Sequence, residues 1–307
     1  MTRKKTISRR RFIRDASIAV AGGTLMLGSR KPAAAAPVSA PAAASAASRS
    51  RVVLVRDRDV LDESLKPKAA VVLAMLDAAV AALCGVKDPR EAWRTIVRPQ
   101  DTVGIKTNVW TYIPTTPQVE GALKQRVMDV GVPEGQIGID DRGVLNNPIF
   151  QKATALINAR PMRTHHWAGV GSLIKNYIMF VPDPSVYHPD SCAELAKIWE
   201  NPLVKGKTRL NVLVMLTPQF HSVGPHNFNP KYVWNYYGLI LGFDPVAVDS
   251  TGLRIIEALR REYFAEERPL NPPAKHILLA DTRFHLGTAD PVKTELLKIG
   301  YDKESFV

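Results

Sequence analysis

The sequence predicts an α/β fold in which a mostly parallel sheet carries flanking helices in a single large domain over residues 49–307. From residue 51 onward, short apolar runs alternate with longer segments whose apolar residues recur at helical spacing. The lengths of these segments suit strand–helix–strand units, and we see no internal repeat. About 260 residues follow residue 48, which is enough for one large domain or two small ones, and we expect one.

The first half of this domain gives six elements in order. A β-branched run at 52–55 predicts a strand, and the Ala-rich segment 68–83 predicts a helix. Residues 102–108 predict a second strand that ends in polar side chains. A helix is expected over 117–130, because a proline lies near its first turn and a glycine follows its end. The remaining expected elements of this half are a strand at 136–139 and a helix at 148–158.

The second half is less regular. Residues 160–189 are rich in proline, histidine and aromatic residues, so we expect a long functional loop with short helices. The run at 210–216 is the clearest buried strand, and amphipathic spacing predicts a long helix over 245–263. The other expected elements are a short helix at 191–199, a loop at 218–230, strands at 234–242 and 276–280, and a C-terminal helix near 292–299.

The N-terminal 48 residues are typical of an export signal. Ser8-Arg9-Arg10-Arg11-Phe12-Ile13-Arg14 resembles a twin-arginine signal, and the apolar segment 16–27 is too short for a stable membrane helix. An Ala/Pro/Ser-rich linker at 32–48 offers small-residue cleavage sites. We therefore expect the twin-arginine translocase to export the folded protein to the periplasm. The alternative is a basic tail that touches nucleic acid, but such a tail needs neither the paired arginines nor the apolar segment.

The formal charge of +12 is concentrated in this leader. Residues 1–50 hold ten of the 41 basic residues and one of the 29 acidic residues, so 31 basic and 28 acidic residues remain, a net of +3. This balance gives no support for a nucleic-acid partner. No later segment reaches about 18 uninterrupted apolar residues, so we expect no permanent membrane span.

The chain has two cysteines, Cys84 and Cys192, and no C-x-x-C motif. Because a thiolate-held iron–sulfur cluster needs about four cysteines, no such cluster can be bound by this chain alone. We expect two small buried side chains, with a disulfide in an oxidising periplasm as the alternative.

Polar side chains follow several predicted strands, where ligands of open α/β sheets collect. Lys106 and Asn108 offer an ammonium and an amide to an anion, although a lysine at a strand end is also common on surfaces. Asp140 and Asp141 form a second group, which could hold a hard cation or exchange protons. For one of these two acids, a turn with Gly143 is the better expectation.

A third group is Arg163-Thr164-His165-His166, followed by Lys175-Asn176. Neighbouring strand residues point to opposite faces, so one histidine is expected to reach a site while the other packs. A further histidine-bearing loop holds His221 and His226, and a mixed imidazole and carboxylate metal site would form if the two loops met.

The fourth group begins the long helix. Asp244 followed by Pro245 predicts a helix N-cap with proline at the first helical position. Asp249 lies inside the helix among small and apolar residues, so its carboxylate requires a partner and is the better functional candidate.

Taken in order, these segments resemble the DUF362 family, a domain of unknown function, over roughly residues 101 to 258. Its members typically show an Ile-Lys-Pro-Asn-like strand end, a Lys-Thr-His segment with a later Lys-Asn, and an Asp-Pro-x-Ala-x-Asp helix start. Thr107 and Arg163 depart from the usual proline and lysine. Some relatives carry a ferredoxin-like cysteine set, which this chain lacks. The resemblance implies no settled activity.

We therefore expect an exported enzyme that acts on a small anionic or hydroxylated substrate, with a divalent metal or a His/Lys acid–base site. His165 is the expected proton carrier, because imidazole titrates near neutral pH. The remaining candidates are Lys106 and Lys175 for negative charge, Asn108, Arg163 and Asn176 for substrate binding, and Asp140, His166 and Asp249 for a metal. The alternative is a non-catalytic periplasmic binding or assembly protein with an exposed apolar patch at 177–189.

Overall fold

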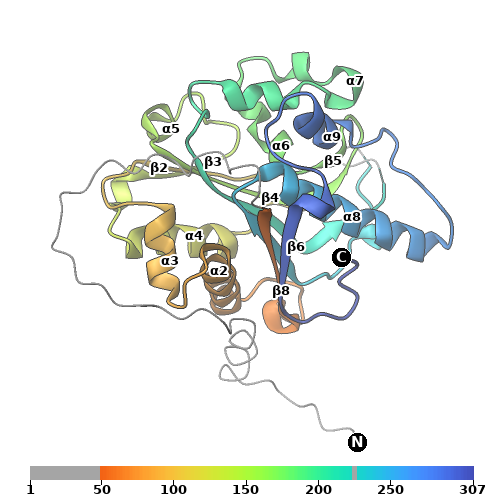
Figure 1. Ribbon diagram of the computed structural model, residues 1–307, viewed down its shortest axis with the longest axis horizontal. Coiled ribbons are helices and arrows are strands. Elements are labelled where there is room, and N and C mark those ends of the chain that lie inside the picture. The colour runs from red at the N-terminus through yellow and green to blue at the C-terminus, as the bar shows by residue number, and fades with distance from the viewer. Residues whose placement is uncertain (1–48, 223–226) are drawn as a thin grey trace, which may run out of the picture. The chain divides into compact units, whose positions relative to one another are not determined.

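The computed structural model describes residues 49–222 and 227–307, so the predicted signal and linker at 1–48, and His226, lie outside the described residues. Arg49–Val307 forms one compact unit around an eight-stranded sheet (Figure 1). The strands are β1 (Ser50–Arg56), β2 (Val103–Lys106), β3 (Ile137–Asp140), β4 (Ala155–His165), β5 (Gly169–Gly171), β6 (Thr208–Gln219), β7 (Gly238–Gly242) and β8 (Thr294–Gly300).

The strand order is β3-β2-β4-β6-β7-β1-β8, and β5 pairs with β4 off this path. Neighbours along the path are parallel except at β7, which runs antiparallel to both β6 and β1. The short β5 is also antiparallel to its partner. The prediction of a mostly parallel α/β sheet is therefore confirmed.

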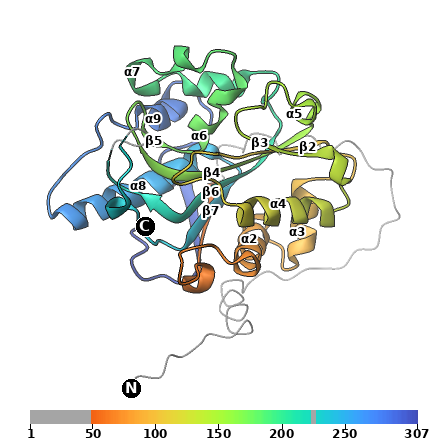
Figure 2. The same ribbon diagram turned by 180° about the vertical axis from the view of Figure 1, so that it is seen from behind.

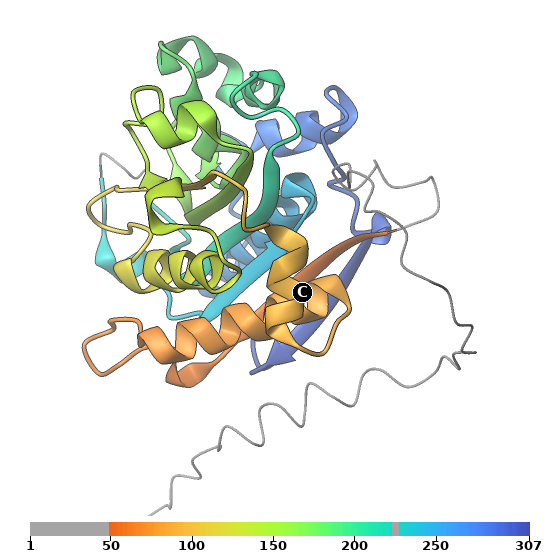
Figure 3. The same cartoon turned by 90° about the vertical axis from the view of Figure 1, so that its left-hand side faces the viewer.

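Helices cover both faces of the sheet (Figures 1 and 2), and the turned view in Figure 3 shows the two helical layers on opposite sides of it. One layer consists of α2 (Ala69–Cys84), α3 (Pro89–Ile96) and α4 (Pro117–Asp129). The other consists of α5 (Pro148–Lys152), α6 (Leu173–Asn176), α7 (Pro189–Cys192), α8 (Pro245–Phe264) and α9 (Lys275–Thr282). Strands β4, β6 and β7 are buried almost throughout, because helices pack on both of their faces.

The long helix α8 begins as its sequence predicts. Asp244 is the N-cap, and its carboxylate accepts hydrogen bonds from the backbone nitrogens of Val246 at 2.8 Å and Ala247 at 3.0 Å. Pro245 occupies the first helical position, where its missing N–H is no loss. The carboxylate also accepts from Ser50 at 2.8 Å, so this cap ties the start of the domain to α8.

Four expectations about secondary structure are wrong. The helix expected at 148–158 ends at Lys152, and strand β4 occupies residues 155–165, where we expected helix and then loop. Residues 276–280 lie in helix α9, and residues 294–299 lie in strand β8. Short apolar runs fit either element by pattern alone, so their place in the fold decides between them. Helix α3 was not expected at all.

Within the described part of the chain, no single helix is long and apolar enough to cross a membrane. Among residues 49–222 and 227–307, α2 and α3 reach that length and composition when taken together, and they are bent by 70° at their break. Cys84 and Cys192 are both free, so the alternative of a disulfide is wrong. Cys192 is buried and Cys84 is half-buried.

Candidate functional site

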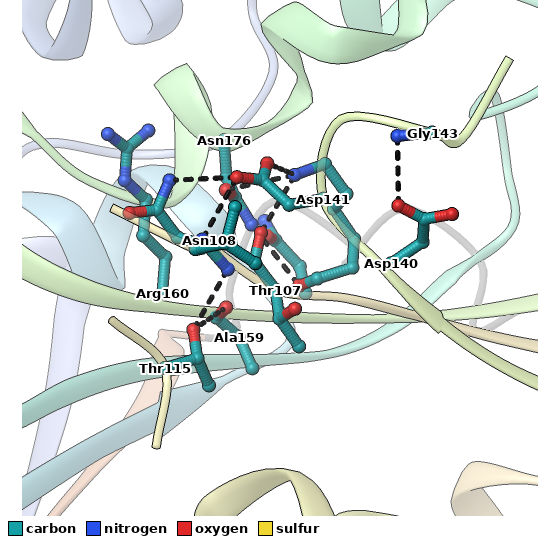
Figure 4. Close-up of polar contacts among 12 residues, drawn as sticks. Thr107, Asn108, Thr115, Asp140, Asp141, Gly143, Ala159, Arg160 and Asn176 are labelled. Carbon is teal, nitrogen blue, oxygen red and sulfur yellow. Dashed lines mark hydrogen bonds and ion pairs between the residues drawn. The ribbon is translucent and has the colours of Figure 1, made fainter. Parts of the chain in front are cut away.

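A buried ion pair lies at the carboxyl ends of β2 and β3. The Lys106 ammonium is 2.5 Å from the Asp141 carboxylate, and the exposed fractions of these side chains are 0% and 4%. Lys106 also donates to the side-chain oxygen of Asn176 at 3.3 Å. The other Asp141 oxygen accepts from the backbone of Val109 at 3.0 Å and from the Asn108 amide at 3.5 Å (Figure 4). The pair is therefore enclosed by polar partners, as buried charges require.

A chain of asparagine side chains links this pair to the centre of the sheet. Asn176 in α6 donates to Asn158 in β4 at 2.8 Å, and Asn158 donates to Asn211 in β6 at 3.2 Å. Asn211 in turn donates to the backbone oxygen of Phe243 at 3.0 Å. All three amides are fully or almost fully buried. Such a satisfied network fixes the positions of α6 and the strand ends relative to one another.

Two arginines on β4 bring further positive charge to the same region. Arg160 and Arg163 have exposed fractions of 4% and 3%. Arg163 donates to the Asn108 oxygen at 3.0 Å and lies 4.2 Å beneath the ring of Trp110. Arg160 makes one long hydrogen bond, 3.4 Å to the backbone oxygen of Ser172. The Nε atoms of both arginines are buried and have no hydrogen-bond partner among the described residues.

Lys175 and His165 lie beside these arginines. Lys175, in α6, donates to the sulfur of Cys192 at 3.6 Å, and its exposed fraction is 3%. His165, at the end of β4, accepts at Nδ1 a hydrogen bond from the backbone nitrogen of Trp167 at 3.2 Å. A neutral imidazole that accepts at Nδ1 carries its proton on Nε2 and can donate there. His166 stacks on His165, with ring centroids 4.9 Å apart.

Asp249 has the partner that its buried position requires. Its carboxylate accepts from the hydroxyl of Ser172 at 2.7 Å and from the backbone nitrogens of Leu173 and Ile174, each at 2.9 Å. These donors lie at the N-terminus of helix α6, so the Asp249 carboxylate, which belongs to α8, caps that helix. Asp249 therefore positions the helix that carries Lys175 and Asn176.

The three candidate metal ligands do not come together. Asp140 accepts from the backbone nitrogen of Gly143 at 2.9 Å and from Asn147 at 3.0 Å, which is the turn role expected for one acid of the pair. Figure 4 shows this turn apart from the Asp141 network. In residues 49–222 and 227–307, no three His, Cys, Asp or Glu side chains are grouped so that they could hold a metal ion. Asp140, His166 and Asp249 therefore form no such group.

Burial dominates the electrostatics of the site. It lowers the pKa of Lys106 to about 8, against the opposing effect of the Asp141 carboxylate. Burial also lowers the pKa of Lys175 to about 8, and the charge of Arg160 adds to this effect. For Asp141, the burial that would raise the pKa is outweighed by Lys106, so the pKa lies below its ordinary value. The Lys106–Asp141 pair is thus charged at neutral pH.

The pKa of His165 is lowered far below its ordinary value, first by burial and then by the charges of Lys175 and Arg160. Its imidazole is therefore neutral at working pH, and the expectation that it carries protons in the free protein is not supported. Burial raises the pKa of Asp249 to about 6, while its hydrogen bonds oppose that shift.

We call Lys106, Arg160, Arg163 and Lys175, with Asp141 and Asp249, the cationic centre. It includes five of the polar side chains that the sequence singles out, namely Lys106, Asp141, Arg163, Lys175 and Asp249. Asn108 and Asn176 bind to its ion pair without belonging to it. Arg160 was not predicted, although its charge acts on almost every other member. Its signal was the polar alternation of Asn158 and Arg160 in an apolar run, which places both on one face of a strand.

The apolar segment at 177–189, expected to be exposed in an assembly protein, is mostly packed into the core. Tyr177 and Phe180 are fully buried, and Ile178 is 7% exposed. Met179, Val181 and Tyr187 pack partly buried against the same core. Val186 is the exposed exception at 62%, so the described part of this segment offers no continuous apolar surface.

One comparison with known proteins agrees with the later motifs, and its match begins after the strand end at 105–108. No curated protein and no solved structure matches the chain. The family model described as "Domain of unknown function (DUF362)" matches residues 122–254, a stretch that runs from α4 to α8 and holds Asp141, Arg160, Arg163, Lys175 and Asp249. This match supports the assignment of residues 122–254 to the DUF362 family.

Proposed function

We propose that this chain is an exported DUF362-type protein that binds a small anionic substrate at the cationic centre and acts on it by proton transfer. One observation carries the proposal. Four cationic side chains are at least nine-tenths buried in one region, where the described residues supply two equally buried carboxylates. Buried charges are expensive unless they are paired, so an excess of buried cations is best explained by an anion that completes the site.

Arg160 and Arg163 are the groups best suited to hold this anion. Guanidinium groups bind carboxylates and phosphates through two parallel hydrogen bonds, and both Nε atoms are still available. Lys106 is less available, because Asp141 and Asn176 already bind its ammonium. In this proposal Lys106 fixes the strand ends, and Asn108 and Asn176 orient the charged groups.

Lys175 replaces His165 as the proposed proton carrier. Its pKa of about 8 lies close to working pH, and its one described hydrogen bond is the long contact to Cys192. His165 would instead donate its Nε2 proton to the substrate as a hydrogen bond. Binding of an anion would raise the pKa of both groups, because it offsets the surrounding positive charge.

Export remains part of the proposal and is supported by the motif at residues 8–14. Replacing Arg9 and Arg10 together by lysine keeps the charge and removes the paired guanidinium groups. We expect the double variant to accumulate in the cytoplasm while the unchanged chain reaches the periplasm, as followed by cell fractionation. Equal export of both would contradict a twin-arginine route.

The binding proposal is tested by native mass spectrometry and elemental analysis of protein purified from its own host. We expect a small anionic molecule to accompany the unchanged protein and to be lost in Arg160→Gln. Lys205→Gln is the matched control, because it removes a surface cation paired with Glu200. If no anion is retained or taken up by the unchanged protein, the proposal is wrong.

A further inference from the structure

The charge balance of the cationic centre indicates the charge of its ligand. Lys106, Arg160, Arg163 and Lys175 contribute four positive charges, and Asp141 and Asp249 contribute two negative charges. Asp140 also acts on Lys106, but it is half-buried and its hydrogen bonds go to its own turn. The buried groups alone therefore leave an excess of two positive charges. This excess would be matched by one doubly charged anion.

Unused hydrogen-bond donors belong to the cationic centre and to the strand beside it. The Nε atoms of Arg160 and Arg163 are buried without a partner among the described residues. Gln219 is fully buried, and neither its amide nitrogen nor its amide oxygen has a described partner. Gln219 lies opposite Arg163 in the pairing of β6 with β4. Native proteins rarely leave buried polar groups unsatisfied, and a missing ligand or water is the usual reason.

These donors differ in kind and come from different elements. Two guanidinium groups come from β4, an amide comes from β6 and the Lys175 ammonium comes from α6. A flat carboxylate accepts hydrogen bonds through two oxygens in one plane, and a single guanidinium can bind both of them. A phosphoryl group offers three strong acceptor oxygens and carries up to two charges. It therefore suits several donors that approach from more than one side.

We propose that the ligand of the cationic centre presents a phosphoryl-type dianion to Arg160, Arg163 and Gln219. This inference rests on the proposed function, because it names the charge and shape of the anion bound there. It adds Gln219, which no motif predicted, as a binding residue. In this inference, the unpaired Nε atoms of Arg160 and Arg163 both donate to the phosphoryl group of the ligand.

Aromatic side chains cover this position and supply a reporter. Trp110 lies over the guanidinium of Arg163, and its ring is 5.2 Å from that of Tyr112 and 5.9 Å from that of Phe228. The centre is almost wholly buried, so a ligand can reach Arg163 only if a covering segment moves. We expect binding to change the fluorescence of Trp110.

The test compares four small anions by isothermal titration calorimetry and tryptophan fluorescence at pH 7.5, in buffer free of other oxyanions. Methyl phosphate is mostly doubly charged at this pH, whereas dimethyl phosphate has a similar shape and one charge. Malonate carries two charges without a tetrahedral group, and acetate carries one. We expect methyl phosphate to bind at least about tenfold more tightly than each of the others, and Trp110→Phe to remove the fluorescence change.

Arg160→Met and Gln219→Leu test the residues themselves. Each is expected to weaken methyl phosphate binding by about ten- to a hundredfold, while Lys205→Gln leaves it unchanged. Arg160→Met should also unfold at an equal or higher denaturant concentration without ligand, because it removes an uncompensated buried charge. If Arg160 were merely structural, its replacement by methionine would instead lower the denaturant concentration at which the protein unfolds, and that result would count against the inference.

The outcomes separate this inference from the function on which it rests. If dimethyl phosphate, acetate or malonate binds as tightly as methyl phosphate, the phosphoryl assignment is overturned and anion binding stands. If none of the four anions binds, both are overturned.

Discussion

Replacement of Asp141 by asparagine tests whether the buried ion pair holds the strand ends together. The variant keeps the shape of the side chain but removes the charge 2.5 Å from the ammonium of Lys106, which has no exposed surface. Breaking a buried pair by removing one partner costs about 3–5 kcal/mol, because the other charge is left buried and uncompensated. For a domain of this size, that corresponds to a fall of about 6–20 °C in the melting temperature.

The free energy of unfolding is measured by urea or guanidinium titration, with far-ultraviolet circular dichroism as the signal. Glu134→Gln is the matched control, because it breaks the 2.6 Å pair with Lys124 on the surface and should change stability little. The double variant Lys106→Met/Asp141→Leu should lose less stability than the two single variants lose in sum, because neither charge of the pair is left buried without its partner. If Asp141→Asn unfolds at the same denaturant concentration as Glu134→Gln, the assumption that the charge is desolvated is refuted.

Three further predictions concern stability. In Gly252→Ala, the new Cβ would lie 2.5 Å from Leu213 Cδ2, so a loss of about 1–3 kcal/mol is expected in a denaturant titration, and an unchanged midpoint would contradict it. Asp244→Ala removes the cap of α8 and should cost about 1–2 kcal/mol by the same assay, whereas Asp244→Asn should recover part of that loss. Burial lowers the pKa of His276 to about 3, so the unfolded chain binds more protons between about pH 3 and 6.5, and stability falls as the pH falls through that range. The raised pKa of Asp249, about 6, changes stability in the opposite direction between about pH 4 and 6. The effect of His276 is therefore measured as a difference between the unchanged protein and His276→Gln in the slope of the free energy of unfolding against pH. Identical slopes would refute this prediction.

The sequence predicts those parts of the fold in which local pattern and tertiary environment agree. Helix α8 combines an N-cap, a proline at the first helical position and amphipathic spacing, and all three indicate the same boundary. The strand at 210–216 is apolar enough that only a buried position suits it. These elements were predicted because each rests on more than one signal.

Strand β4 shows why the rest could not be predicted. It contains Pro161 and the polar residues Asn158, Arg160 and Arg163, which are typical of a loop rather than of a central strand. The pairing of β4 with β6 shifts register between Pro161 and Arg163. The pattern is abnormal because the strand carries the candidate site, and local rules are often broken at such places.

The candidate residues were predicted better than their roles. Motif positions placed Lys106 at a strand end, and Lys175 and Asp249 in segments expected beside the same edge of the sheet, where ligands collect. The sequence could not show that His165 would be surrounded by cations and held neutral. Nor could it show that Asp141, rather than Asp140, would pair with Lys106. Both depend on distances that only the folded chain defines.

The position of β1 has a consequence for synthesis of the protein. This strand comes first in the described domain, yet its two neighbours are β7 and β8, which lie near the other end of the chain. A nascent polypeptide therefore cannot cover β1 until translation is almost complete. Premature termination before residue 294 would leave one edge of β1 open to pair with other chains, so an incomplete product is expected to aggregate or to be degraded.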